Sequence, residues 1–555
     1  MRPLLVMLLV CWGCLVRAAP LPGFLDSSRI EAHLPTPNLS MDAYRPAAPA
    51  LLLPAPSALQ QPALATSTPV QVHKVRFEGG TVYPLSDLRE HYQPLIGRQV
   101  SLGELVELTD RLTQRYRQDG YLLSYALLPP QDFSEGRVRV VLVEGYIGDY
   151  QIEGDIGPAR DYLAQLMDKL MTERPLTRAS LERYTGLIGR IPGVTAQAQV
   201  LAPGTADGRA RMVVRALRKP FTGTAQLNDG SRDDLQALLG ASSNAQTRFA
   251  EQLSASVLTP PGEDEAHYYR LDYAQFVDDE GSQLLLSASR YRSDPRTRIR
   301  LGNGDDLIQQ RDSERYSVGL SQPLIVSANE WLEAVGRIYM VKDRIDYQWL
   351  GAPRQMDSET NVRALSFEVD WRKAEARRLR IVSGGVYQGL DHFGARSNGG
   401  DDLDFLRLRL SGLQSDDFTE HWQGVASAAG YWSNDSLPDS ERVVFGGQNF
   451  GRGYPRDQAS GDKGWGLAYE LNYSFRREGD WFRVLQPYAV LDAARAWFNK
   501  LEVQSTRMSS AALGLRFGDG RGYSIAVEVA RPMSDIALDS LSRRPRLMVS
   551  FGFQL

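Results

Sequence analysis

The C-terminal part of the chain alternates between apolar and polar positions. Leu365, Phe367 and Val369 share one parity, while Ser366 and Glu368 share the other, and similar alternation recurs at 467–475, 523–529 and 547–555. A period of two residues is typical of a β-strand that has one apolar face. Residues 220–555 show no convincing helix, and sixteen antiparallel strands of roughly ten residues would fill that length. The pattern therefore predicts a large domain of antiparallel strands.

A different pattern precedes this domain. Residues 71–145 read as strand, helix, helix, strand, strand, and the capping box Ser101-Leu-Gly-Glu104 opens the second helix. The same order recurs over 147–217, and the segments beginning at Arg137 and Arg209 occupy the same place in each copy. We expect two α+β repeats of about 70 residues, covering 70–145 and 146–218.

The N-terminus has the layout of a secretory signal peptide. Arg2 is followed by an apolar run from Leu4 to Val16 and by small residues at 18 and 19. We expect residues 1–19 to be removed, and with them Cys11 and Cys14, the only cysteines. Residues 20–69 form an N-terminal segment whose second half is rich in proline and alanine, which predicts an extended linker.

Composition excludes several classes of function. The 555 residues carry a formal net charge of -4 and a pI near 6.0, so the chain lacks the basic field that nucleic-acid binding needs. Six histidines show no metal-ligand spacing, and neither a Gly-x-Ser-x-Gly elbow nor a phosphate loop is present. We expect no enzyme activity, no cofactor and no metal.

A glycine-rich turn presents one arginine within the strand-rich region. Residues 445–455 read Phe-Gly-Gly-Gln-Asn-Phe-Gly-Arg-Gly-Tyr-Pro, and the arginine is Arg452. The glycines allow a tight turn and keep bulky side chains away from the guanidinium. We therefore expect Arg452 to reach a partner elsewhere in the molecule.

Alternation alone does not place the strands in a membrane, because a soluble β-sandwich alternates too. A signal peptide, a mature chain without cysteine, aromatic residues near strand ends and an uninterrupted series of strands together favour an outer-membrane barrel. The chain ends in Phe551-Gly-Phe553-Gln-Leu555; outer-membrane barrels usually end in an aromatic residue that the assembly machinery reads, so this strand departs in Leu555, and we expect Phe553 to serve instead.

With these features the chain resembles, over about 70–555, the outer-membrane transporters of two-partner secretion, the TpsB or hemolysin-activation family. The resemblance implies two periplasmic POTRA domains at 70–145 and 146–218, and a sixteen-stranded barrel at 219–555. It also implies an extracellular loop that folds back into the lumen. The loop tip of the family matches Gly451, Arg452, Gly453 and Tyr454, with Gly451 in place of the usual Val.

In that family the loop arginine meets an acidic residue on the barrel wall, in a strand that reads Asp-x-Gly. Asp492 matches this position, with Ala494 in place of Gly. Strict alternation puts Asp492 on the face of Tyr488 and Val490. We therefore keep Glu470 and Glu528, whose faces are otherwise small or polar, as reserve partners of Arg452.

The resemblance also implies a partner, a large secreted exoprotein of the TpsA type that is an adhesin or a cytolysin. An unfolded exoprotein could add a strand to an exposed sheet edge of a POTRA domain. The candidate edges are those of Val138, Val140, Val194 and Val200. Other expected contacts are outer-membrane lipids and the barrel assembly machinery of a Gram-negative bacterium.

Two alternatives remain open. One is an insertase that folds other barrels into the outer membrane, which usually has more POTRA repeats. The other is a soluble, secreted β-rich binding protein, which would need no Arg-Gly-Tyr loop.

Overall fold

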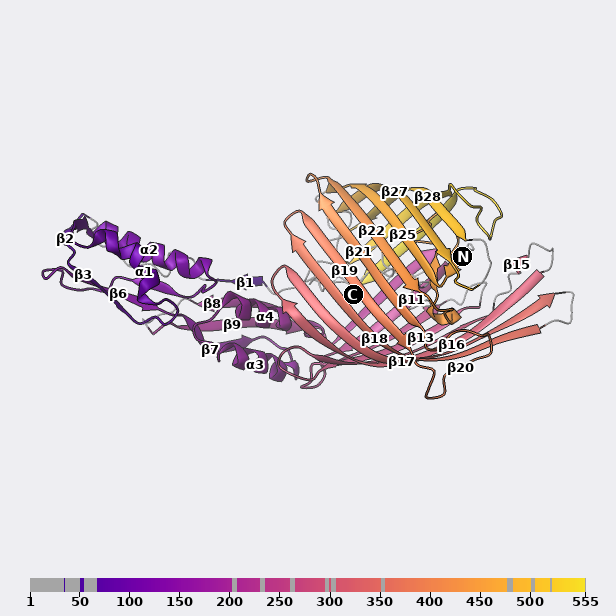
Figure 1. Ribbon diagram of the computed structural model, residues 1–555, viewed down its shortest axis with the longest axis horizontal. Coiled ribbons are helices and arrows are strands. Elements are labelled where there is room, and N and C mark those ends of the chain that lie inside the picture. The colour runs from indigo at the N-terminus through magenta and orange to yellow at the C-terminus, as the bar shows by residue number, and fades with distance from the viewer. Residues whose placement is uncertain are drawn as a thin grey trace, which may run out of the picture.

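The computed structural model describes residues 34, 50–53, 67–201, 207–229, 235–259, 265–294, 299–300, 306–350, 355–476, 483–500, 505–519 and 522–554. The expected signal peptide at 1–19 and most of the segment at 20–69 lie outside these residues. Two small α+β units follow one another at one end of the molecule, with the second next to a β-barrel that forms the rest (Figure 1). None of the helices described is long and apolar enough to cross a membrane.

The first unit has the predicted order of elements. A three-stranded sheet of order β3-β6-β5 packs against two helices, and a two-stranded sheet of β2 and β4 lies beside it. The elements are β2 Pro69–Gln71, β3 Lys74–Glu78, α1 Leu85–Tyr92, a 3-10 turn Gln93–Leu95, β4 Gln99–Ser101, α2 Leu102–Gln118, β5 Tyr125–Leu127 and β6 Arg137–Val143. The Ser101 hydroxyl accepts from the Glu104 N–H at 3.2 Å, which is the expected capping box.

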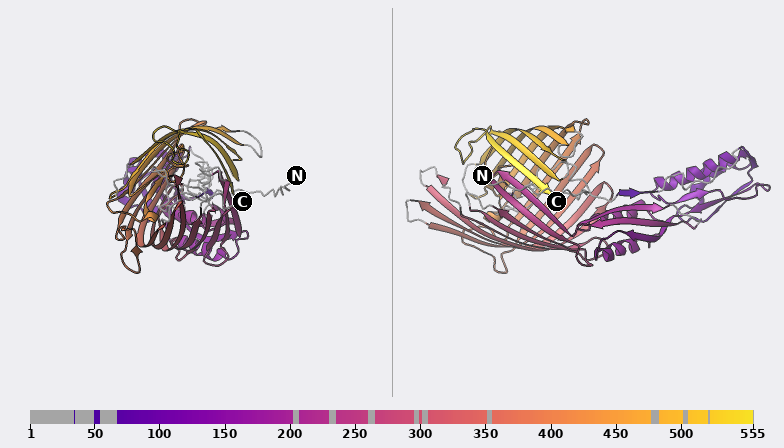
Figure 2. Two further views of the ribbon diagram at one scale, coloured as in Figure 1. Left: turned by 90° about the vertical axis from the view of Figure 1, so that its right-hand side faces the viewer. Right: turned by 180° about the vertical axis from the view of Figure 1, so that it is seen from behind.

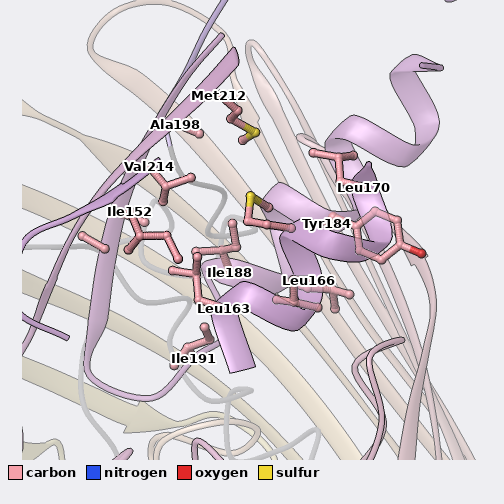
Figure 3. Packing of buried hydrophobic residues seen from close by; sticks show 14 of the residues in the cluster. Ile152, Leu163, Leu166, Leu170, Tyr184, Ile188, Ile191, Ala198, Met212 and Val214 are labelled. Carbon is pink, nitrogen blue, oxygen red and sulfur yellow. The ribbon is translucent and has the colours of Figure 1, made fainter. Parts of the chain in front are cut away.

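The second unit repeats this arrangement. Its elements are β7 Tyr146–Glu153, α3 Ala159–Leu170, α4 Arg178–Ile188, β8 Val194–Leu201 and β9 Arg209–Arg218. Leu163, Leu166 and Ile188 project from the helices toward Ile152 and Val214 of the sheet (Figure 3). A short strand β1, Ala50–Leu52, runs parallel to β8 and extends this sheet to β1-β8-β9-β7.

The barrel is a closed antiparallel sheet with sixteen long strands among the described residues. These are β10 Phe221–Asp229, β11 Leu235–Asn244, β12 Gln252–Thr259, β13 His267–Phe276, β14 Gln283–Ser293, β16 Asp306–Val326, β17 Glu330–Leu350, β18 Gln355–Glu375, β19 Arg378–Gly389, β21 Leu406–Asp417, β22 Trp422–Ser433, β25 Lys463–Tyr473, β27 Val484–Trp497, β28 Thr506–Gly518, β29 Tyr523–Pro532 and β30 Arg546–Gln554. Three two-residue strands extend them, namely β15 Ile299–Arg300, β20 Arg396–Ser397 and β26 Phe475–Arg476. The barrel closes where β30 pairs with β10 (Figure 2).

Alternation along the strands separates two environments. Leu365 and Phe367 on β18 are 43% and 55% exposed and face outward, whereas Glu368 is buried on the inner face. Strands β16, β17 and β18 have 21 residues each, about twice the predicted length, and project beyond their neighbours (Figure 1). These strands are longer than a strand needs to be to cross a bilayer. At their ends remote from the N-terminal units, ion pairs such as Arg344 with Asp346 favour contact with water.

The second unit is bound tightly to the barrel. The Glu280 carboxylate, in the turn after β13, accepts from the Arg183 guanidinium and the Tyr184 hydroxyl, each at 3.0 Å. The Tyr162 ring stacks on Phe276 with centroids 4.3 Å apart. These contacts fix the second unit against the strand ends nearest to it.

Candidate functional site

The loop between β22 and β25, residues 434–462 and here called the lumen loop, folds back against the inner barrel wall. A two-stranded sheet of β23 Val443–Phe445 and β24 Ala459–Gly461 stiffens it. Phe445, Phe450 and Tyr454 of the loop form one buried cluster with Ala494 and Met508 of the wall, among others. The loop therefore occupies part of the lumen and packs there as a core does.

Glycines allow the backbone at the tip of the lumen loop to turn and to approach the barrel wall closely. Gly446, Gly447 and Gly451 have φ values of 129°, 78° and 88°, which side chains disfavour. A Cβ on Gly453 would lie 2.5 Å from the Pro532 nitrogen of β29, so only glycine allows this approach to the wall. The turn thus holds Arg452 directly against the barrel.

The guanidinium of Arg452 binds two carboxylates on the wall. Nη1 lies 2.5 Å from Glu528 Oε2, and Nη2 lies 3.2 Å from Glu470 Oε2. These are the residues kept in reserve, on β29 and β25. All three side chains are largely buried.

Asp492 has a different place from the one expected. Its carboxylate does not bind the guanidinium but accepts the backbone N–H groups of Gly451 at 2.8 Å and Arg452 at 3.2 Å. The Ser510 hydroxyl also lies 2.7 Å from both carboxylate oxygens. The expected side-chain pairing is thus wrong: both Asp492 oxygens accept from backbone and hydroxyl donors instead. Asp492 thus holds the loop backbone, while the two glutamates hold its arginine.

The inner face of β27 carries apolar residues, which is why the alternation of the sequence did not identify Asp492 as a lumen-facing residue. Tyr488, Val490 and Asp492 are all buried on the inner face, and Leu491 between them is 64% exposed on the outer face. Tyr488 and Val490 pack against Ala512 and Ala530 of the neighbouring strands, while Ala494 further along packs against the lumen loop. An apolar face therefore does not mark the lipid side on this strand.

Further polar groups balance the charges at the tip. Arg516 Nη2 donates to Glu470 Oε1 at 3.1 Å, and the Tyr488 hydroxyl donates to Glu528 Oε2 at 2.9 Å. Two arginines thus face two glutamates. Burial alone would lower the pKa of Arg452, but the carboxylates of Glu528 and Glu470 outweigh burial and raise it, so the guanidinium stays charged.

Tyr454 completes the tip motif. Its hydroxyl lies 3.3 Å from the Ser509 carbonyl oxygen and 3.1 Å from the Ser534 hydroxyl, and it accepts the Ser534 N–H at 3.2 Å. The tip is therefore also bound to β28 and to the loop that follows β29.

A second ionic contact holds the base of the lumen loop against β21, and the sequence did not predict it. Arg407 Nη2 of β21 lies 3.2 Å from Glu441 Oε2, and the Tyr339 hydroxyl donates to that oxygen at 3.1 Å. The Arg407 guanidinium also lies over the Tyr387 ring, at 4.1 Å from its centroid. The alternation Leu406-Arg-Leu-Arg-Leu410 was the available signal, because it puts arginines on the inner face.

The expected substrate edges differ from the sheets observed. Val138 and Val140 lie on β6, which is the central strand of its sheet because β3 inserts parallel on one side and β5 antiparallel on the other. Val194 and Val200 lie on β8, an outer strand of its own repeat, but β1 already pairs with its residues 197–199. Neither strand presents a free edge along its whole length.

Across the described ranges, no group of three or more His, Cys, Asp or Glu side chains is arranged to hold a metal ion.

Two family models match the chain. The model "POTRA domain, ShlB-type" matches residues 70–145, and the model "Haemolysin secretion/activation protein ShlB/FhaC/HecB" matches residues 218–517, more than half of the chain. The chain belongs to this haemolysin secretion/activation family. It is therefore an outer-membrane transporter of two-partner secretion, and it acts with a secreted exoprotein.

Individual relatives agree with this placement. The chain is 22% identical over 472 residues to the heme/hemopexin transporter protein HuxB of Haemophilus influenzae, covering 79% of each chain. It is 23% identical over 462 residues to the outer membrane transporter CdiB of Escherichia coli, covering 78% of this chain and 73% of CdiB.

Solved structures show the same fold. The structure of CdiB from Escherichia coli matches with a TM-score of 0.68 at 20% identity, covering 90% of this chain and 93% of that one. BamA from Haemophilus ducreyi lacking POTRA domains 1–3 matches with a TM-score of 0.50 at 13% identity, covering 87% and 100%.

Proposed function

We propose that an unfolded exoprotein in the periplasm binds the two N-terminal units and passes through the barrel when the tip of the lumen loop leaves the wall. In this proposal residues 70–145 and 146–218 are POTRA domains 1 and 2, and 219–555 is the barrel. The second unit supports this division because it repeats the strand-helix-helix-strand-strand order of the first. The exoprotein is a TpsA-type adhesin or cytolysin.

The observation that carries the mechanism is the contact of Arg452 with Glu470 and Glu528. Each hydrogen bond between charged groups contributes about 1.5–3 kcal/mol, which positions the loop without fixing it permanently. A polypeptide chain that enters the lumen has polar groups that compete for these hydrogen bonds, and it can push the loop aside. Arg452 therefore holds the loop in a pose from which transport starts.

The exoprotein adds a strand to the second unit at β8. This addition requires β1, Ala50–Leu52, to leave, because both strands use the same edge of β8 at 197–199. The barrel itself is inserted by the assembly machinery, which reads the C-terminal strand ending in Phe551-Gly-Phe553-Gln-Leu555.

Complementation tests the proposal. The gene is deleted in its host and replaced by wild type, by Arg452→Ala or by the control Arg344→Ala, whose side chain is exposed and pairs with Asp346 outside the lumen. We expect Arg452→Ala to abolish export of one large exoprotein while the barrel remains inserted and heat-modifiable on gels. The control should secrete as wild type does.

Each other outcome points elsewhere. Normal secretion by Arg452→Ala contradicts the role of the arginine. A general loss of outer-membrane barrels in the deletion strain indicates an insertase. Recovery of the protein in the soluble fraction indicates a soluble β-rich binding protein.

A further inference from the structure

A row of outward-facing residues crosses five strands near the barrel end that is remote from the N-terminal units. Each member of the row lies directly opposite the next on the neighbouring strand. The row consists of Leu410, Gly430, Trp465, Arg495 and Arg507. Two arginines thus stand side by side on the outer surface of the barrel.

The row lies at the boundary between apolar surface and water. Arg495 has the parity of Leu491, which is 64% exposed, and Arg507 has the parity of Leu513, which is 69% exposed. Trp465, directly opposite Arg495, is 39% exposed. Because tryptophan concentrates at the headgroup level of membrane proteins, the two guanidinium groups lie at that level as well.

Within the described ranges, few contacts surround these two charges: the Asp535 carboxylate accepts the backbone N–H of Arg507 at 2.8 Å, and the Arg495 guanidinium lies 5.5 Å from the centroid of the Trp497 ring. Arg495 donates from Nε and Nη2 to the neutral Ser505 hydroxyl at 3.2 and 2.9 Å, and neither arginine forms an ion pair with a described carboxylate. Like charges directly opposite each other destabilise a sheet. Arg290, another arginine on the outer surface, is by contrast paired with Asp312 at 2.8 Å. Two neighbouring guanidinium groups without a described carboxylate partner are suited to bind an anion.

An apolar groove borders the row. It has a volume of about 600 Å³, and small side chains floor it where the neighbouring strands meet. Leu467 and Leu491 flank it, and its small residues are Gly412, Ala426, Ala428 and Ala493. Beside it, a Cβ on Gly430 would meet nothing closer than the Leu410 carbonyl oxygen at 3.9 Å. The groove thus lies in the lipid-facing surface next to the row, and its lining residue Ala493 is two positions from Arg495 on the same strand.

We propose that Arg495 and Arg507 bind a phosphate group of an outer-leaflet glycolipid, and that an acyl chain of the same lipid lies in the groove. The planar fork of arginine matches phosphate oxygens, and apolar surface continuous with the lipid band matches a hydrocarbon chain. The outer-leaflet assignment rests on the proposed periplasmic position of the N-terminal units. The lipid would neutralise the arginine pair and fix the barrel wall beside the strands that carry the lumen loop.

Binding measurements on the full-length protein in detergent test this site. Native mass spectrometry would follow titration with phosphorylated lipid A, with dephosphorylated lipid A and with inorganic phosphate. Wild type should prefer the phosphorylated lipid by at least about tenfold, and Arg495→Gln/Arg507→Gln should lose this preference. The control Arg290→Gln/Arg344→Gln should retain it.

A second variant tests the groove separately. Ala428→Trp fills the groove without changing charge, so it should weaken both lipids while leaving the preference for phosphate. Heat-modifiable migration shows that each variant is folded.

Three outcomes would overturn the site. They are equal affinity of wild type for the two lipids, an unchanged preference in the double arginine variant, and full displacement of the lipid by inorganic phosphate, which indicates a free-anion site. Failure here leaves the secretion test of Arg452 unaffected, because that test does not involve the outer surface.

Discussion

The lumen loop is held at two places that use the same chemistry in different surroundings. At its base, the Arg407 and Glu441 side chains are 3% and 0% exposed. At its tip, Arg452 is 17% exposed, and its partners Glu470 and Glu528 are 11% and 7% exposed. Both contacts join arginine to glutamate, but only the tip retains some access to water.

This difference predicts which contact opens first. Separating a buried pair leaves two charges in a medium of low dielectric, whereas water can solvate charges at a wetter contact as they separate. Leu437, fully buried among residues that include Tyr339, Tyr387 and Phe405, adds an apolar anchor at the base. The base is therefore the fixed end, and the tip is the end that swings.

The largest expected effect comes from Glu441→Gln, which removes the charge that compensates Arg407. Leaving one buried charge unpaired costs about 3–5 kcal/mol, so the base should detach. A cysteine placed by Ser440→Cys, a small change at a site 5% exposed, reports detachment through maleimide labelling. Its labelling rate should rise about 100-fold or more.

Asp312→Asn serves as the control, because its pair with Arg290 lies on the outer surface. It should leave the labelling of Ser440→Cys unchanged. Slow labelling in Glu441→Gln would show that Leu437, rather than the ion pair, fixes the base.

Gly453→Ala should release the tip and leave the base in place. The new Cβ would lie 2.5 Å from the Pro532 nitrogen and 2.6 Å from the Arg531 carbonyl carbon, and backbone cannot move aside easily. Overpacking of this kind costs about 1–3 kcal/mol. A cysteine placed by Asn449→Cys should therefore label faster, and secretion should fall.

Ser440→Cys should label at the wild-type rate in the Gly453→Ala background. The matched control is Gly336→Ala on β17, where a Cβ meets nothing within 4 Å. Equal labelling increases at both reporters would mean that the loop moves as one body, which contradicts the separation of base and tip.

Asp492→Asn should have a smaller effect on the tip. The amide retains one oxygen for the backbone N–H groups of Gly451 and Arg452 but loses the charge, at a cost of about 1–2 kcal/mol. Secretion should decrease partly, whereas Arg452→Ala should abolish it. Full loss in Asp492→Asn would make the backbone contact as important as the arginine.

The sequence could predict the tip because local chemistry marks it. Glycines flank Arg452, and Glu470 and Glu528 interrupt faces of small residues. The base left no local mark, because Glu441 on the loop and Arg407 on β21 are 34 residues apart in the chain and meet only when the loop folds back against the inner wall. Periodicity likewise predicted the antiparallel strands of the barrel and the elements of the first repeat, because local alternation and capping residues mark them.

Local sequence patterns did not predict which distant segments pair as strands. The parallel insertion of β3 makes β6 a central strand, and β1 reaches β8 from well over 100 residues away in the chain. The length of β16, β17 and β18 was also missed, because alternation continues past the membrane, where cross-strand ion pairs rather than lipid support it.

The smallest expected effect is that of Asp439→Asn, which tests whether the base depends on one pair or several. Arg311 Nη1 lies 2.9 Å from Asp439, but its Nη2 also lies 2.7 Å from Asp343, whose side chain is 2% exposed. Arg311 thus keeps a buried partner. Asp439 also lies 3.3 Å from Arg442 Nη1, but Arg442 keeps Asp401 at 3.3 Å, so with Asp439 21% exposed the two lost contacts together are worth less than about 1 kcal/mol.

Labelling of Ser440→Cys should therefore change less than about fivefold in Asp439→Asn. An increase as large as that of Glu441→Gln would mean that the two acidic residues act as one unit. The base would then be a cooperative network, and the contrast with the tip would lie in the number of coupled charges rather than in burial alone.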